Sequence, residues 1–166
     1  MTIPSSRFIF GMVFFGCCFL MAVALFMEHI MHLEPCPLCI LQRIMVITTA
    51  ITAVIAAIHH PRELGIKIYG GLIIASAATG GGVSIRQLWL QSLPDDEVPA
   101  CGASLDYMLE VFPLDEVLSI VLTGDGSCAE VLWTFLGISI PGWTLVGFIG
   151  LITIGIFQII RPLRHA

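Results

Sequence analysis

Charged side chains are scarce in this chain of 166 residues: they make up 11% of it, whereas hydrophobic residues make up 57%. A soluble domain of this size needs charges spread along its length to cover its surface, and long windows here contain none. With only 7 Lys and Arg residues and a formal net charge of -5, the chain has no basic face for phosphate groups, which excludes a nucleic-acid partner. Mean hydropathy is +0.98, so we predict a single membrane domain over residues 1–166.

The chain also lacks a nucleotide-binding motif and a signal-peptide cleavage site. Without a flavin or nucleotide motif, a bound nucleotide is not expected as an electron acceptor. The first apolar run is too long for a signal peptide, its only preceding charge is Arg7, and no small-residue cleavage pattern follows it. We therefore expect this run to be retained as a membrane anchor.

Four apolar runs are long enough to cross a bilayer, whose hydrocarbon core of about 30 Å requires roughly 20 helical residues. They cover approximately residues 8–27, 39–58, 66–90 and 143–160. The third run contains small residues that let neighbouring helices approach closely in lipid: Gly70, Gly71, Ser76, Gly80, Gly81 and Gly82. The predicted fold is an all-α membrane protein, a bundle of four transmembrane helices.

Basic residues gather on one side of the predicted bundle. That side holds both termini and the turn 59–65, with the basic residues Arg7, Arg62, Lys67, Arg161 and Arg164 and only one of the 12 acidic residues, Glu63. Because positive charge marks the cytoplasmic side, we predict a multi-pass protein with both termini in the cytoplasm. The loops 28–38 and 91–142 then face outward, into an oxidising periplasm if the host is a bacterium.

The second outer loop, residues 91–142, is too long to be a simple connector. After Pro113, a residue favoured at the first helical position, apolar residues recur at helical spacing with acids in the first turn: Leu114, Val117, Leu118, Val121 and Leu122, with Asp115 and Glu116. Thr123 to Gly126 end the pattern. We expect a short helix that either lies in the outer interface of the membrane or packs onto the bundle.

Four of the six cysteines lie at the outer side of the predicted bundle: Cys36, Cys39, Cys101 and Cys128. Cys17 and Cys18 lie inside the first apolar run, where we expect them to behave as small apolar residues. Cys36-Pro37-Leu38-Cys39 is a C-x-x-C motif, which often has a lowered thiolate pKa. Such motifs also serve metal sites and structural bridges, so the motif alone does not decide its chemistry.

Arg43 lies four residues after Cys39, on the same helix face and just inside the apolar run. An ionisable residue in this position is a functional candidate, because it could stabilise a Cys39 thiolate and donate to a carbonyl oxygen of a bound molecule. The alternative is an arginine that extends to the lipid headgroups. The neighbouring C-x-x-C favours the functional interpretation.

The second pair, Cys101 and Cys128, permits two interpretations. It could be a static staple of the long loop. A second pair on the same side as a C-x-x-C also permits thiol–disulfide exchange between the pairs, provided that the loop brings one sulfur onto another. Two such pairs make an electron relay plausible.

A third interpretation is a metal site. His29, His32, Cys36 and Cys39 have the spacing H-x-x-H-x-x-x-C-x-x-C, which could ligate zinc or copper. Pro35 and Pro37 restrict how these side chains could converge. The rival functions are therefore a metal-binding membrane protein and a structural protein with stapled loops.

Taken together, these motifs resemble the DsbB family of disulfide bond formation proteins over nearly the whole chain. The resemblance rests on Pro35-Cys36-Pro37-Leu38-Cys39, Arg43, Cys101, Cys128-Ala129-Glu130, Trp133, Phe135-Leu136-Gly137, Pro141 and Trp143. It implies a four-helix bundle in the bacterial inner membrane that reoxidises a periplasmic thioredoxin-like oxidase, DsbA, and delivers two electrons to ubiquinone or menaquinone. A lipid-soluble acceptor also fits the physics, since a cysteine pair alone can only exchange disulfides.

The resemblance also implies a role for each site residue. Cys101 would form the mixed disulfide with the partner, Cys128 would exchange with Cys36, and Cys39 would face the quinone beside Arg43. Some family members carry a histidine near the outer end of the third run, where this chain has Arg86 and Gln87. Gln87 can still donate a hydrogen bond, so we include it as a candidate quinone contact.

Overall fold

A computed structural model of the chain describes residues 5–94, 96–99, 105–124 and 126–160. Within these ranges, four helices are long and apolar enough to cross a membrane. They are α1 (Ser6–His29), α2 (Pro37–His59), α3 (Glu63–Gln91) and α7 (Ile140–Ile160). The predicted class, an all-α membrane protein with four spanning helices, is confirmed.

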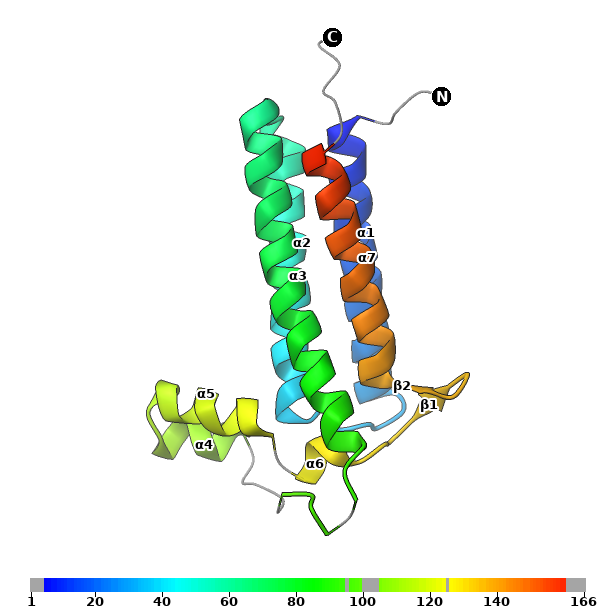
Figure 1. The fold of residues 1–166 in the computed structure, drawn as a ribbon, viewed down its shortest axis with the longest axis vertical. Coiled ribbons are helices and arrows are strands. Elements are labelled where there is room, and N and C mark those ends of the chain that lie inside the picture. The colour runs from blue at the N-terminus through cyan, green and yellow to red at the C-terminus, as the bar shows by residue number, and fades with distance from the viewer. Residues whose placement is uncertain (1–4, 95, 100–104, 125, 161–166) are drawn as a thin grey trace.

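The four long helices stand side by side in a bundle (Figure 1). α2 packs against α1 and α3, and α3 packs against α7 as well. Buried side chains from all four helices fill the middle of the bundle, among them Phe10, Val46, Ile73 and Phe148. The beginning of α1, the end of α7 and the α2–α3 connection lie at one end, opposite the short elements (Figure 1).

Glycines allow α3 and α7 to approach closely. A Cβ atom added to Gly70 would lie 3.2 Å from the carbonyl oxygen of Gly155, and one added to Gly155 would lie 3.2 Å from that of Gly70. At Gly80 a Cβ atom would lie 2.3 Å from the ring of Phe148, which is 1% exposed. Small residues in the third apolar run therefore serve helix packing. Gly71 and Gly82 are exceptions, because a Cβ atom added to either would have no neighbour within 4 Å.

Replacing Gly80 with alanine is expected to destabilise the bundle by about 1–3 kcal/mol, because the added methyl group must displace the buried ring of Phe148. Gly82→Ala is the matched control, since its methyl group meets open space and alanine favours helix. Unfolding in detergent, followed by circular dichroism, measures both. Equal stability of the two variants would contradict the close α3–α7 contact at Gly80.

The described part of the segment between α3 and α7 forms three short helices and a hairpin. They are α4 (Leu105–Val111), α5 (Leu114–Thr123), α6 (Gly126–Ala129), β1 (Thr134–Phe135) and β2 (Ile138–Ser139). The strands are antiparallel, with Thr134 opposite Ser139 and Phe135 opposite Ile138. Leu136 and Gly137 have φ values of 53° and 79°, the two positive values that a two-residue hairpin turn of type I′ requires.

Helix α5 lies beside the end of the bundle that carries the short elements, roughly perpendicular to the long helices (Figure 1). Its Val117 and Val121 are buried in one cluster with Leu38 of α2 and Leu90 of α3, which agrees with the predicted packing onto the bundle. The helix starts one residue later than expected, because Pro113 is its extended N-cap rather than its first helical residue. Its other apolar residues are exposed, namely Leu114, Leu118, Ile120 and Leu122, so contact of this side of the helix with lipid stays a prediction.

Candidate functional site

The C-x-x-C motif lies where α2 begins, at the end of the bundle that carries the short elements. Cys36 is the N-cap of α2: its backbone is extended, and its Sγ accepts a hydrogen bond from the backbone N–H of Cys39 at 3.4 Å. Pro37 follows as the first helical residue. Its fixed φ suits the helix, and its missing N–H costs no hydrogen bond, because an N–H at this position has no acceptor within the helix. The motif therefore starts the helix and sets Cys39 in its first turn.

Three of the four cysteines singled out in the sequence meet here. Sγ of Cys36 lies 2.9 Å from Sγ of Cys39, and Cys36 also hydrogen bonds with Cys128, which is 0% exposed in α6. The contact with Cys128, then the contact with Cys39, and burial all raise the pKa of the Cys36 thiol well above its ordinary value. Cys36 thus touches both other sulfurs, whereas Cys101 lies outside the described residues.

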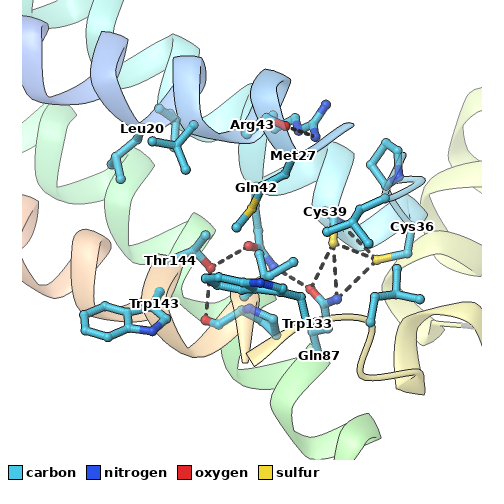
Figure 2. A pocket seen from close by; sticks show the side chains of 18 of the residues that line it. Leu20, Met27, Cys36, Cys39, Gln42, Arg43, Gln87, Trp133, Trp143 and Thr144 are labelled. Atoms are coloured by element: carbon cyan, nitrogen blue, oxygen red, sulfur yellow. Dashed lines mark hydrogen bonds between the residues drawn. The ribbon is translucent and has the colours of Figure 1, made fainter. Parts of the chain in front are cut away.

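Gln87 of α3 faces the two sulfurs of the motif (Figure 2). Its Nε2 lies 3.2 Å from Sγ of Cys36 and 3.3 Å from Sγ of Cys39, and the residue is only 3% exposed. An amide N–H donates more strongly to a thiolate than to a neutral sulfur, so this contact favours negative charge on either cysteine. The sequence suggested Gln87 as a quinone contact; Gln87 lines the cavity described below while its donor group is directed at the sulfurs, so a quinone contact stays a prediction.

A chain of buried and half-buried polar side chains continues from Gln87 through the bundle (Figure 2). Gln42 donates from Nε2 to Oε1 of Gln87 at 2.8 Å, and Thr144 donates to Oε1 of Gln42 at 2.7 Å. Ser84 lies 3.2 Å from the Thr144 hydroxyl. These three residues were not predicted from the sequence, although each is a polar residue in an apolar run, where an unpaired polar group is costly.

An apolar cavity of about 470 Å³ adjoins the sulfurs. It extends between α1 and α7, and its wall includes Phe19, Leu20, Met27, Trp133, Trp143 and Phe148. Cys36, Cys39, Gln42 and Arg43 also line it. The cavity therefore offers a mostly apolar space of ligand size with a few polar groups at one end, the usual composition of a small-molecule site.

The hairpin supplies an aromatic wall to this cavity. The rings of Trp133 and Phe135 stack with their planes 4° apart and their centroids 5.9 Å apart. Trp143 donates from its indole nitrogen to the carbonyl oxygen of Phe135 at 3.1 Å, and Ser139 donates to Oε1 of Gln91 at 2.8 Å. These contacts fasten the hairpin to α7 and to the end of α3.

Arg43 reaches from α2 to α1. Its guanidinium pairs with the carboxylate of Glu28 and donates to the carbonyl oxygen of Ala24 at 3.3 Å. The two charged side chains are 22% and 30% exposed. Glu28 was not predicted from the sequence, because nothing in the chain order indicates that residues fifteen positions apart on two helices will meet.

The metal interpretation gains no support from the described residues. Within them, no group of three or more His, Cys, Asp or Glu side chains could hold a metal ion. His29 instead contacts the carbonyl oxygen of Leu25 with its Nδ1, at 3.1 Å. His32 has a left-handed backbone with φ of 54° in the connection that precedes α2.

Comparison with known proteins gives a consistent family match. The family model described as Disulfide bond formation protein DsbB matches residues 6–158. A protein named Disulfide bond formation protein B from Marinobacter nauticus is 56% identical over 157 residues, which cover 95% of this chain and 94% of the relative. A protein of the same name from Saccharophagus degradans is 50% identical over 96% of each chain. Disulfide bond formation protein B 1 of Pseudomonas aeruginosa is 42% identical over 97% of this chain and 99% of its own.

Proposed function

Because the chain belongs to the DsbB family, bacterial membrane oxidoreductases of disulfide bond formation, we propose that it takes two electrons from a periplasmic DsbA-like dithiol and passes them to ubiquinone or menaquinone. One observation carries the proposal: Cys36 contacts both Cys39 and Cys128 at the wall of an apolar cavity. A structural staple would need neither the second sulfur contact nor the cavity.

The exchange proceeds by two attacks on disulfide bonds. A partner thiolate attacks Cys101 of the Cys101–Cys128 disulfide, forms a mixed disulfide, and releases Cys128 as a thiolate. Cys128 then attacks Sγ of Cys36 in the Cys36–Cys39 disulfide, and Cys39 leaves with the electron pair of the broken bond. The contact between Cys36 and Cys128 supports this order, because the second attack then needs little movement.

Return of the exchange completes the cycle. The second cysteine of the partner attacks the partner sulfur that is bonded to Cys101. The partner then leaves with its own disulfide formed, and Cys101 is released as a thiolate. Cys101 attacks Cys128, restores the loop disulfide and releases Cys36. The Cys36–Cys39 dithiol then carries the two electrons and two protons that came from the partner, so the protein itself is unchanged once this pair is reoxidised.

The cavity residues fit a quinone as the acceptor. A bound quinone supplies a two-electron, two-proton sink. The aromatic wall of Trp133 and Phe135 suits a flat ring, and the guanidinium of Arg43 can donate to a carbonyl oxygen. Cys39 lines the same cavity, whose wall includes residues of the spanning helices α1 and α7, which suits a lipid-soluble acceptor.

The proposed orientation has the cysteines in the periplasm and both termini in the cytoplasm. Arg7, Arg62 and Lys67 belong to the end of the bundle opposite the C-x-x-C motif, within the described helices and their caps. Lys67 pairs with Glu63 at 3.7 Å, and both side chains are exposed. This distribution of basic residues supports the orientation through the positive-inside rule.

A partner that keeps only its attacking cysteine should accumulate as a mixed disulfide linked to Cys101, because no second partner thiol is present to resolve it. Non-reducing electrophoresis and peptide mass spectrometry identify the linked residue. Cys101→Ser should abolish the adduct and stop oxidation of the unaltered partner. Linkage at Cys36 or Cys39 in the unaltered chain would contradict the proposed order of exchange.

A further inference from the structure

The amide of Gln87 is held by a second glutamine rather than by solvent or backbone. Among the described contacts, Oε1 of Gln87 accepts from Nε2 of Gln42 at 2.8 Å and meets the thiol of Cys39 at 3.6 Å. Gln42 is 4% exposed, so no bulk water competes for this bond. An amide that uses its oxygen in this way presents its NH₂ group to the other side, where the sulfurs lie.

Thr144 holds Gln42 in turn, and the buried Ser84 lies 3.2 Å from the Thr144 hydroxyl. The Thr144 hydroxyl donates to Oε1 of Gln42 at 2.7 Å, and Ser84, which is 0% exposed, bonds to the Gly80 carbonyl oxygen at 3.0 Å. With its oxygen engaged by Thr144, Gln42 directs its NH₂ group at Gln87. Three helices, α2, α3 and α7, therefore contribute to the orientation of one amide (Figure 2).

We propose that Gln42 is a positioning residue for the redox pair: it holds Gln87 so that the NH₂ group of Gln87 faces both Cys36 and Cys39 and stabilises the reduced pair. This inference rests on the proposed redox role of these two cysteines.

The contact between Gln87 and the two sulfurs favours the reduced state of the Cys36–Cys39 pair. When Cys128 bonds to Cys36, the Cys36–Cys39 bond breaks and Cys39 keeps the electron pair as a thiolate. The amide donors of Gln87 interact strongly with this charged sulfur and weakly with the sulfurs of a disulfide. Gln42 therefore favours electron uptake from the loop cysteines, and its loss makes the Cys36–Cys39 pair harder to reduce.

The test is the reduction potential of the Cys36–Cys39 pair in the full chain. A Cys101→Ser/Cys128→Ser background isolates this pair, which is equilibrated with glutathione buffers, acid-quenched and alkylated. The peptides that contain Cys36 and Cys39 are then quantified by mass spectrometry. Gln42→Met removes the amide while keeping the length of the side chain. We expect its equilibrium constant for reduction to fall about tenfold, which corresponds to about 30 mV for a two-electron couple.

Three further variants separate positioning from a general packing effect. Gln87→Met should lower the equilibrium constant at least as much, and Gln42→Met should then add nothing in the Gln87→Met background, because the two act through one contact. Thr144→Val should cause a smaller fall. The control is Gln158→Met, which alters another buried glutamine, at the opposite end of α7, and should leave the potential unchanged.

The outcomes distinguish this inference from the proposed function. If the reduction potential of the Cys36–Cys39 pair is unchanged in Gln42→Met but lower in Gln87→Met, the positioning role of Gln42 is overturned and the relay is left intact. Additive effects of the two substitutions would also overturn it, since Gln42 would then act independently of Gln87. Failure of the unaltered chain to reduce a quinone with partner electrons would refute the proposed function instead.

Discussion

Cys39→Ser is expected to reduce the rate of quinone reduction to that of a protein-free control. Among the described cysteines, Cys39 alone both contacts Cys36, at 2.9 Å between the sulfurs, and occupies the first turn of α2 at the cavity wall. Without it, Cys36 has no disulfide from which electrons can leave, and serine cannot form one. The loss should therefore appear in kcat at every quinone concentration.

The first exchange should survive in the same variant. Cys101 and Cys128 are unaltered, so reduced partner still opens one loop disulfide per chain and forms a single stoichiometric burst of oxidised or linked partner. Cys18→Ser is the matched control, because Cys18 is exposed on α1 and does not line the cavity. It should turn over at the unaltered rate. Sustained turnover of Cys39→Ser would show that electrons leave by another route.

Arg43→Gln is expected to raise the KM for quinone by about ten- to a hundredfold, since a hydrogen bond from a charged donor contributes about 1.5–3 kcal/mol. Arg43 lines the cavity, and its contacts with Glu28 and Ala24 keep the guanidinium on the α1 side of it. If its charge acts mainly on the developing transition state, the loss will appear in kcat rather than KM. Arg43→Lys should be intermediate, because lysine keeps the charge but loses the planar set of donors.

The matched control for this experiment is Arg86→Gln. Arg86 donates to the carbonyl oxygen of Thr123 at 2.9 Å and its guanidinium carbon lies 4.2 Å from the ring centroid of Trp89, and it does not line the cavity. Its loss should leave the KM for quinone unchanged. Steady-state quinone reduction with reduced partner, over a range of quinone concentrations, measures all variants. An unaltered KM and kcat in Arg43→Gln would leave Arg43 as a structural tie between α1 and α2.

The sequence was sufficient for the four spanning helices and for α5. Long apolar runs have one stable solution in lipid, because a helix satisfies its own backbone hydrogen bonds. The short helix was visible because Val117 and Val121 recur at helical spacing beside other apolar residues. The hairpin was not predicted, since Leu136 adopts a positive φ that its residue type does not suggest.

The candidate site was only partly predictable. Cys36, Cys39 and Arg43 belong to one short motif, so their proximity follows from helical spacing alone. The links from Gln42 to Gln87 and Thr144 join positions 45 and 102 residues apart. These contacts depend on how each helix is rotated about its axis, which the apolar pattern of a spanning helix hardly constrains because lipid and core are both apolar.

The most direct test of the account is the stoichiometry of electron transfer. Purified protein in detergent, with excess reduced partner and a known amount of ubiquinone or menaquinone under anaerobic conditions, is followed by quinone absorbance and by alkylation of the remaining partner thiols. We expect the unaltered chain to form one quinol for each partner disulfide. The Cys39→Ser variant should form no quinol and only a single stoichiometric burst of oxidised or linked partner. Partner disulfides that form continuously while the quinone stays oxidised would contradict it.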